Sequence, residues 1–189
     1  MAGDPENAKK LIDTGVTGIA YETVTSPDGS MPLLAPMSTI AGQLAFIVGS
    51  YHLLKHNKGK GVMIGKMDDI DPRVVTVIGA GVSGTQSILK AIDNNAMVKV
   101  VDSSQSKLDE LQSKYGSNNI EYVLSTQESI QSSINDSDLV IGSVYVVGKE
   151  APKVVKREML SSMNPGTVMV DVSIDQGGCF ETSKPTTHD

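Results

Sequence analysis

Short apolar runs alternate with amphipathic stretches from residue 74 onward, and this alternation restricts the possible folds more than any other feature. The runs are rich in Val, Ile and Leu and comprise residues 74–78, 98–102, 121–124, 138–144 and 167–172. Parallel strands need crossover connections, which are usually helices that cover both faces of the sheet. The pattern therefore predicts an α/β fold built on a doubly wound parallel sheet.

Segments with helical spacing separate the runs and also precede them. We expect a helix after the first run as far as about residue 94, and further helices over residues 106–115, 127–134 and 154–160. An apolar row from Ile40 to Leu54 at helical spacing predicts a long, well-buried helix ahead of the sheet. Ala41, Ala45 and Gly49, four residues apart, give this helix a second face of small residues for close packing. Pro36 is expected near its start, with Ser38 as the N-cap.

Two other segments complete the expected organisation. Residues 15–25 are predicted as a short strand, which ends at the turn sequence Ser-Pro-Asp-Gly-Ser over residues 26–30. Residues 57–72, rich in Gly, Lys and Asp, are predicted as a loop between two units.

Composition excludes several classes of function. The 189 residues carry a net charge of -6, which offers no basic surface to nucleic acid or to an anionic membrane. The uncharged residues 29–54 are too polar to span a bilayer, and we expect no secretory signal. Cys179 is the only cysteine, so we expect no disulfide, no multi-thiolate zinc site and a cytoplasmic location.

A G-x-G-x-x-G sequence, Gly79-Ala-Gly-Val-Ser-Gly84, directly follows the first run. In a dinucleotide-binding turn such glycines permit the tight turn, the approach of a pyrophosphate and close packing of helix on strand. Asp102 ends the next run, where a carboxylate binds the ribose hydroxyls and repels a 2′-phosphate. These features predict NAD as the cofactor rather than NADP. The alternative is three turn glycines and a surface aspartate in an ordinary α/β protein.

Further candidate residues follow the other runs, because ligands collect at the carboxyl ends of strands in such sheets. They are Ser125, residues 143–145 and residues 173–178. Asp175 is either a polar contact near the nicotinamide or a loop cap, and its spacing leaves both open.

Metal and thiol chemistry find little support in the sequence. His52 and His56 have the spacing of a metal-binding pair, but no Glu lies between them and no third ligand is evident, so we expect no metal site. Cys179 has no base nearby in the sequence and is expected to be an inert thiol.

Several motifs together resemble NAD-dependent alanine dehydrogenase, in the family that also holds the transhydrogenase alpha subunit. They are Gly15-VTGIAYETV, Pro36-Met-Ser38, Gly79-AGVSG, Ala151-Pro-Lys153 and, above all, VDVSIDQGGCFETSKPTTH over residues 170–188. The last motif is far more specific than the glycine sequence and favours alanine dehydrogenase over the transhydrogenase. The resemblance covers essentially the whole chain. It implies reversible deamination of L-alanine to pyruvate and ammonia with NAD, by a homo-oligomer that is usually a hexamer.

The resemblance also implies residue roles. It assigns cofactor binding to Ser38, Gly79, Ala80, Gly81, Val82 and Gly84 at the pyrophosphate, Asp102 at the ribose, Lys107 and Ser125 beside the adenosine, and Val144 and Val172 in the pocket wall. Asp175 is assigned to both cofactor and catalysis, as an acid near the nicotinamide.

The resemblance divides the chain into two expected domains. Residues 1–35 are predicted as a remnant of the substrate domain, and residues 36–189 as a C-terminally truncated, Rossmann-type NAD-binding domain. The Arg, Lys and His with which the family holds substrate and transfers protons have no counterpart here. We therefore expect a fragment or split product that acts on alanine only if the missing domain is supplied. The alternative is an NAD-binding regulatory or interaction module that catalyses no reaction.

Overall fold

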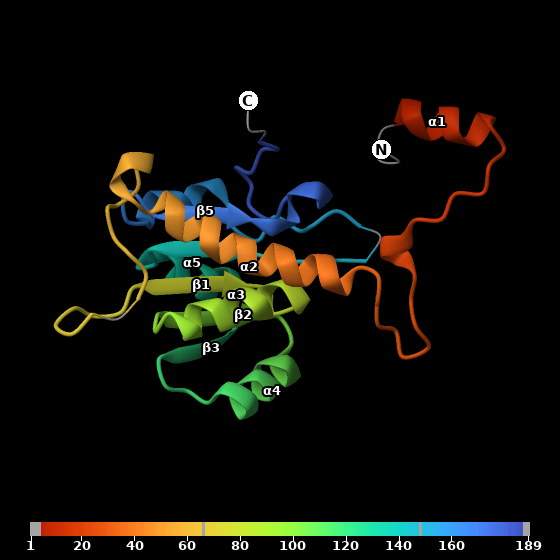
Figure 1. Cartoon of the computed structure of the whole chain (residues 1–189). Helices are drawn as coiled ribbons and strands as arrows, with labels where there is room; N and C mark the ends of the chain where they lie inside the picture. The colour runs from red at the N-terminus through yellow and green to blue at the C-terminus, as the bar shows by residue number, and fades with distance from the viewer. Residues whose placement is uncertain (1–4, 66, 148, 187–189) are drawn as a thin grey trace. The chain divides into compact units, whose positions relative to one another are not determined.

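The five apolar runs form one parallel sheet, which confirms the doubly wound α/β fold. The computed structural model describes residues 5–65, 67–147 and 149–186. Its strands are β1 (Val74–Ile78), β2 (Met97–Asp102), β3 (Ile120–Leu124), β4 (Leu139–Gly142) and β5 (Val168–Asp171). Their order is β3-β2-β1-β4-β5, and all neighbouring pairs are parallel (Figure 1). The winding direction reverses between β1 and β4, which is where such sheets bind ligands.

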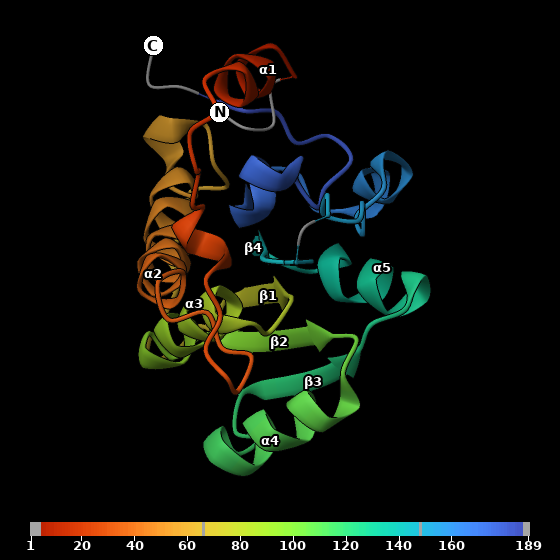
Figure 2. The ribbon, with the colours of Figure 1, turned by 90° about the vertical axis from the view of Figure 1, so that its right-hand side faces the viewer.

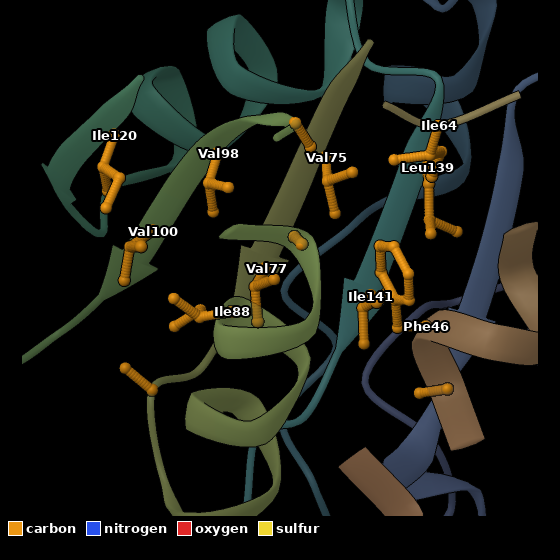
Figure 3. Packing of buried hydrophobic residues seen from close by; sticks show 14 of the residues in the cluster. Phe46, Ile64, Val75, Val77, Ile88, Val98, Val100, Ile120, Leu139 and Ile141 are labelled. Atoms are coloured by element: carbon orange, nitrogen blue, oxygen red, sulfur yellow. The ribbon is translucent and has the colours of Figure 1, made fainter. Parts of the chain in front are cut away.

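Helices cover both faces of the sheet (Figure 2). Each face has its own apolar core. The helices are α2 (Ala35–His52), α3 (Val82–Asp93), α4 (Gln105–Tyr115) and α5 (Gln127–Asn135). On one face Phe46 of α2 and Ile88 of α3 pack over Val77 and Ile141 (Figure 3). The other face of the sheet packs against α5. Side chains of the strands thus enter two opposite cores, which explains why the runs are mostly apolar rather than strictly alternating.

Helix α2 packs through Phe46 and the small residues Gly42, Ala45 and Gly49 rather than through its apolar row. A Cβ atom at Gly42 would lie 2.0 Å from the carbonyl oxygen of Ser83, and one at Gly49 would lie 2.5 Å from Leu139 Cδ1. The predicted buried row is wrong, since Ile40 and Leu44 on that row are 60% and 50% exposed. Glycine allows close approach at both positions, to the backbone of Ser83 at Gly42 and to the side chain of Leu139 at Gly49. Within the described ranges, no helix is both long and apolar enough to cross a bilayer.

The chain divides into two units, Met1–Pro36 and Met37–Asp189. The first contains α1 (Pro5–Asp13) and a 3-10 helix, Tyr21–Thr23. The strand predicted for residues 15–25 is wrong, because a strand needs a neighbour to pair with its backbone groups. All the strands assigned in the described chain belong to the sheet of the second unit.

Three other boundaries differ from the sequence prediction. Helix α2 begins at Ala35, so Ser38 lies inside its first turns and is not the N-cap. The helix predicted over residues 154–160 is replaced by a 3-10 helix, Arg157–Ser162, because Val155 is extended and pairs with Phe180. The loop over residues 57–72 lies within the second unit instead of joining two units.

A buried ion pair fastens that loop to the sheet. Lys60 Nζ lies 2.5 Å from Asp138 Oδ1, and Asp138 Oδ2 accepts a hydrogen bond from the backbone N–H of Val74 at 3.1 Å. Asp138 directly precedes β4, so its carboxylate joins the start of β1 to the start of β4. The side chain of Asp138 is 5% exposed, whereas that of Lys60 is 28% exposed. The two partners therefore differ in how well water could replace the lost contact.

This asymmetry predicts the relative cost of breaking the pair. Lys60→Met leaves the buried Asp138 carboxylate without its positively charged partner and should lower the free energy of unfolding by about 3 kcal/mol. Asp138→Asn keeps an acceptor for Val74 and should cost only about 1 kcal/mol. Urea denaturation of both variants measures the difference. Lys99→Met is the control, because its partner Asp136 is 58% exposed and the loss should stay below about 1 kcal/mol. Equal costs for Lys60→Met and Asp138→Asn would contradict this account.

Candidate cofactor site

The glycine sequence forms a tight turn between β1 and α3. Gly79 has φ +93°, and its N–H donates to the Val101 carbonyl at 2.8 Å. A Cβ atom at Gly79 would lie 2.6 Å from the Ser143 carbonyl oxygen, and one at Gly84 would lie 1.8 Å from the Gly79 carbonyl oxygen. Side chains at these two positions would push α3 and the β4 loop away from the end of β1. The predicted roles in turning and packing therefore have a direct structural reason.

Gly81 differs from its neighbours because the protein itself does not require a glycine there. Its φ is −66°, and an added Cβ atom would meet no other atom within 4 Å. Gly81 is also the N-cap of α3 and makes no side-chain capping bond, while Val82 beside it is exposed. Open space before the N–H groups of a helix N-terminus is suited to a phosphate. The geometry of the turn thus fits a pyrophosphate.

Asp102 is held against this turn from the end of β2. Its Oδ2 accepts a hydrogen bond from the Ala80 N–H at 2.7 Å, and its Oδ1 accepts one from the Ser104 N–H at 2.9 Å. A carboxylate has about four acceptor positions, so two remain for a ligand. The sequence predicts a ribose-binding role for Asp102. It does not predict the hydrogen bond from Ala80, because no rule of residue spacing specifies that contact.

Lys107 and Ser125 lie near the same end of the sheet as Asp102. Ser104 caps α4 and places Lys107 in the first turn of that helix. The N–H of Ser125 donates to the Asp102 carbonyl at 2.9 Å, directly after β3. Both residues are half-buried. The structure therefore gathers three of the residues expected at the adenosine around the ends of β2 and β3.

Hydroxyl groups fix the loops that follow β4 and β5. Ser143 Oγ donates to the Gly79 carbonyl at 2.6 Å, and Ser173 Oγ donates to the Val144 carbonyl at 2.8 Å. Val144 and Val172 are half-buried and pack against different cores. Ser143 and Ser173 are the first residues of the two candidate ranges, 143–145 and 173–178, that the sequence places at the ends of the fourth and fifth runs. The sequence did not indicate these particular hydrogen bonds.

Ser38 lies on α2, and the packing of α2 on the first turn of α3 relates it to the candidate site. It is half-buried and lies one turn before Gly42, whose position faces Ser83 in the first turn of α3. Its predicted contact with a pyrophosphate stays a prediction.

Asp171 and Asp175, four residues apart in the specific closing motif, have opposite environments. The carboxylate of Asp171 accepts from the N–H groups of Ser173 at 3.0 Å, Cys179 at 2.8 Å and Phe180 at 3.0 Å, and also from the Ser183 hydroxyl. It therefore performs the loop capping that was one alternative for Asp175. Within the described chain, the exposed carboxylate of Asp175 has no hydrogen-bond partner. Asp175 is thus available to a ligand.

The remaining polar candidates have structural surroundings. Burial, followed by the nearby charge of Asp171, raises the pKa of the Cys179 thiol to about 12, so the thiol stays protonated and unreactive at neutral pH. His52 and His56 both pack edge-on against the ring of Tyr51. In the part of the chain that the structure describes, no three His, Cys, Asp or Glu side chains are grouped as metal ligands.

Comparison with known proteins identifies close relatives. Residues 45–189 match the family model for the alanine dehydrogenase/PNT C-terminal domain. The chain is 47% identical to the alanine dehydrogenase of Halomonas elongata over 188 residues, which cover 100% of this chain and 50% of that protein. It is 46% identical to the alanine dehydrogenase of Mycobacterium tuberculosis, across 95% of this chain and 48% of that protein. The chain spans about half the length of these curated relatives.

Solved structures give the same result. An L-alanine dehydrogenase matches with a TM-score of 0.91 and 39% identity, over 99% of this chain and 52% of that one. A transhydrogenase from Sinorhizobium meliloti matches with a TM-score of 0.78 and 26% identity, over 96% of this chain and 54% of that one. Identity is thus higher to the alanine dehydrogenase, as the closing motif predicted.

Proposed function

The chain belongs to the alanine dehydrogenase/PNT C-terminal domain family, and from this we propose that it is the NAD-binding part of an alanine dehydrogenase. The observation that supports this best is the turn at Gly81, where open space meets an uncapped helix N-terminus beside the fixed carboxylate of Asp102. The proposed reaction is the reversible deamination of L-alanine to pyruvate and ammonia. When bound, NAD would serve as the hydride acceptor.

Each residue set has a part in this proposal. The turn from Gly79 to Gly84 holds the pyrophosphate, and Asp102 binds the adenosine ribose and repels a 2′-phosphate. Lys107 and Ser125 contact the adenosine, while Val144 and Val172 form pocket walls. Ser38 adds a hydroxyl at the pyrophosphate.

Asp175 is proposed as the acid at the reaction centre. Oxidation of an amine at carbon develops positive charge on the resulting iminium nitrogen, and a nearby carboxylate stabilises that charge. Asp175 is suited to this because no donor among the described residues occupies its carboxylate oxygens. The substrate carboxylate and the proton transfer steps would require cationic and basic groups from the other half of the enzyme.

Assembly and location are part of the same proposal. Residues 1–35 would belong to the substrate domain and residues 36–189 to the NAD-binding domain of a homo-oligomer, with a hexamer as the expected state. The exposed apolar row of α2, which includes Ile40 and Leu44, supplies a surface that such an assembly could cover. We expect the enzyme to work in the cytoplasm, where a lone buried thiol remains reduced.

Cofactor preference tests the Asp102 assignment. Residues 1–189 should bind NADH more tightly than NADPH, as measured by NADH fluorescence titration. Asp102→Asn should narrow this preference by removing the charge while retaining one acceptor oxygen. Asp102→Ala should also narrow it, and in addition weaken NADH binding by about tenfold or more because the Ala80 N–H loses its acceptor. Equal binding of both cofactors by the wild-type chain would refute the assignment.

Turnover tests whether the missing half is needed. Residues 1–189 alone should show no appreciable alanine-dependent reduction of NAD, because they contain no evident cation and base for the substrate. Adding the substrate domain in trans should restore activity if the two parts dock. Rapid turnover by the isolated chain would mean that the substrate residues lie within it. Normal NADH binding without restored activity would instead favour a binding module.

Asp175→Asn tests the proposed acid in a full-length enzyme that carries this sequence. The substitution keeps the size of the side chain but removes its charge, so kcat should fall by about a hundredfold or more with little change in NAD affinity. Steady-state kinetics and NADH titration together measure the two effects. A near-normal kcat would exclude catalysis by Asp175, and a selective loss of NAD binding would make it a cofactor ligand only.

A further inference from the structure

Residues 151–155 run beside the turn that follows Asp175 and bind its backbone. The N–H of Ala151 donates to the Gln176 carbonyl at 2.9 Å, and the N–H of Val154 donates to the Cys179 carbonyl at 2.8 Å. Between these two bonds lie the carbonyls of two further residues, Gly177 and Gly178. A side chain, rather than the backbone, reaches both.

That side chain is Lys153. Its ammonium group donates to the Gly178 carbonyl at 2.6 Å and also to the Gly177 carbonyl. The neighbouring Pro152 has no N–H, so the backbone ladder has a gap at this point. An ammonium carries three donors and can therefore satisfy two carbonyls at once.

The two glycines explain why their carbonyls turn toward one ammonium. Gly177 has φ +86° and Gly178 has φ +78°, a left-handed pair that a residue with a side chain would adopt only with strain. Gly177 ends the 3-10 helix Val172–Gln176, which carries Asp175, and its N–H donates to the Ile174 carbonyl at 3.1 Å. Lys153 therefore fixes the end of the short helix on which Asp175 stands.

We propose that Lys153 is a positioning residue that holds the Asp175 turn against the nicotinamide half of the crevice. This inference rests on the proposed function, since it takes that half of the crevice to hold the nicotinamide. A dinucleotide lies across the carboxyl ends of the strands, with its adenosine at β2. Asp102 lies at that adenosine end, whereas Lys153 acts on the loop after β5. Loss of the Lys153 ammonium should therefore weaken binding of the nicotinamide half of the cofactor and leave binding of the adenosine half unchanged.

Two ligands separate the two halves. NADH contains the nicotinamide, and ADP-ribose lacks it but keeps the adenosine and both phosphates. In residues 1–189, Lys153→Met should weaken NADH binding by about tenfold, equivalent to the loss of a charge-assisted hydrogen bond, and change ADP-ribose binding by less than about twofold. Lys153→Arg should stay within about threefold of the wild type for NADH, because a guanidinium also offers several donors to the two carbonyls.

A third measurement needs no cofactor. Backbone amide hydrogen exchange of the unliganded chain should become faster over residues 174–179 in Lys153→Met, and remain unchanged over β1 and α3. Lys58→Met is the control for lost charge, because Lys58 is exposed on the loop that leads to the start of β1, away from the carboxyl ends of the strands. It should leave both affinities and the exchange pattern as in the wild type.

The outcomes distinguish the two proposals. A wild-type chain that binds neither NADH nor ADP-ribose refutes the proposed function, and the inference about Lys153 with it. Wild-type binding that Lys153→Met leaves unchanged refutes only the role of Lys153. Equal losses of NADH and ADP-ribose binding, or faster exchange throughout the sheet, would show a general structural role and also overturn the inference. A selective NADH loss that Lys153→Arg repairs supports it.

Discussion

Backbone-to-backbone packing at the end of β1 determines where the other parts of the site can lie. The 1.8 Å from a Cβ atom at Gly84 to the Gly79 carbonyl oxygen means that α3 begins directly against the turn. Ser143 closes the opposite side through its hydroxyl bond to the same carbonyl. Helix α2 then packs on α3 at Gly42, where an added Cβ atom would lie 2.0 Å from the Ser83 carbonyl oxygen. These close contacts thus bring two helices and the ends of β1 and β4 together around one helix N-terminus, the feature suited to a phosphate.

The parts of the fold that the sequence predicts are those with a local, periodic cause. Val74–Ile78 and the other runs are β-branched and apolar because both faces of the sheet are covered, and the glycine spacing follows from one turn. The buried face of α2 could be predicted only in part, since the spacing of small residues indicated Ala45 and Gly49 but not Phe46. Hydrophobicity pointed to Ile40 and Leu44, but the fit of Gly42 and Gly49 against other elements decided the packing.

The residues of the candidate site also differ in whether a local pattern in the sequence predicts them. Gly81 and Asp102 stand at fixed places relative to strands, so sequence analysis finds them. Lys60 with Asp138, and Lys153 with Gly178, are joined only by the folded chain, across separations of 78 and 25 residues. The loop-capping role of Asp171 cannot be recognised in the sequence for a similar reason. The N–H groups that surround its carboxylate become neighbours only after the left-handed glycine turn has formed. Side-chain bonds to a distant backbone leave no periodic trace in the sequence.

The bond from Asp102 to the Ala80 N–H has a consequence for redesigning this protein. Under the role proposed for Asp102, accommodating a 2′-phosphate would require removal of its negative charge. The same carboxylate also accepts the hydrogen bond from the Ala80 N–H, at 2.7 Å, that holds the Gly79–Gly84 turn. The proposed cofactor preference and the rigidity of the turn would therefore depend on one side chain and could not be optimised independently. An engineer who wants an NADP-using form would need a neutral acceptor at position 102, together with a new cation placed elsewhere on α4.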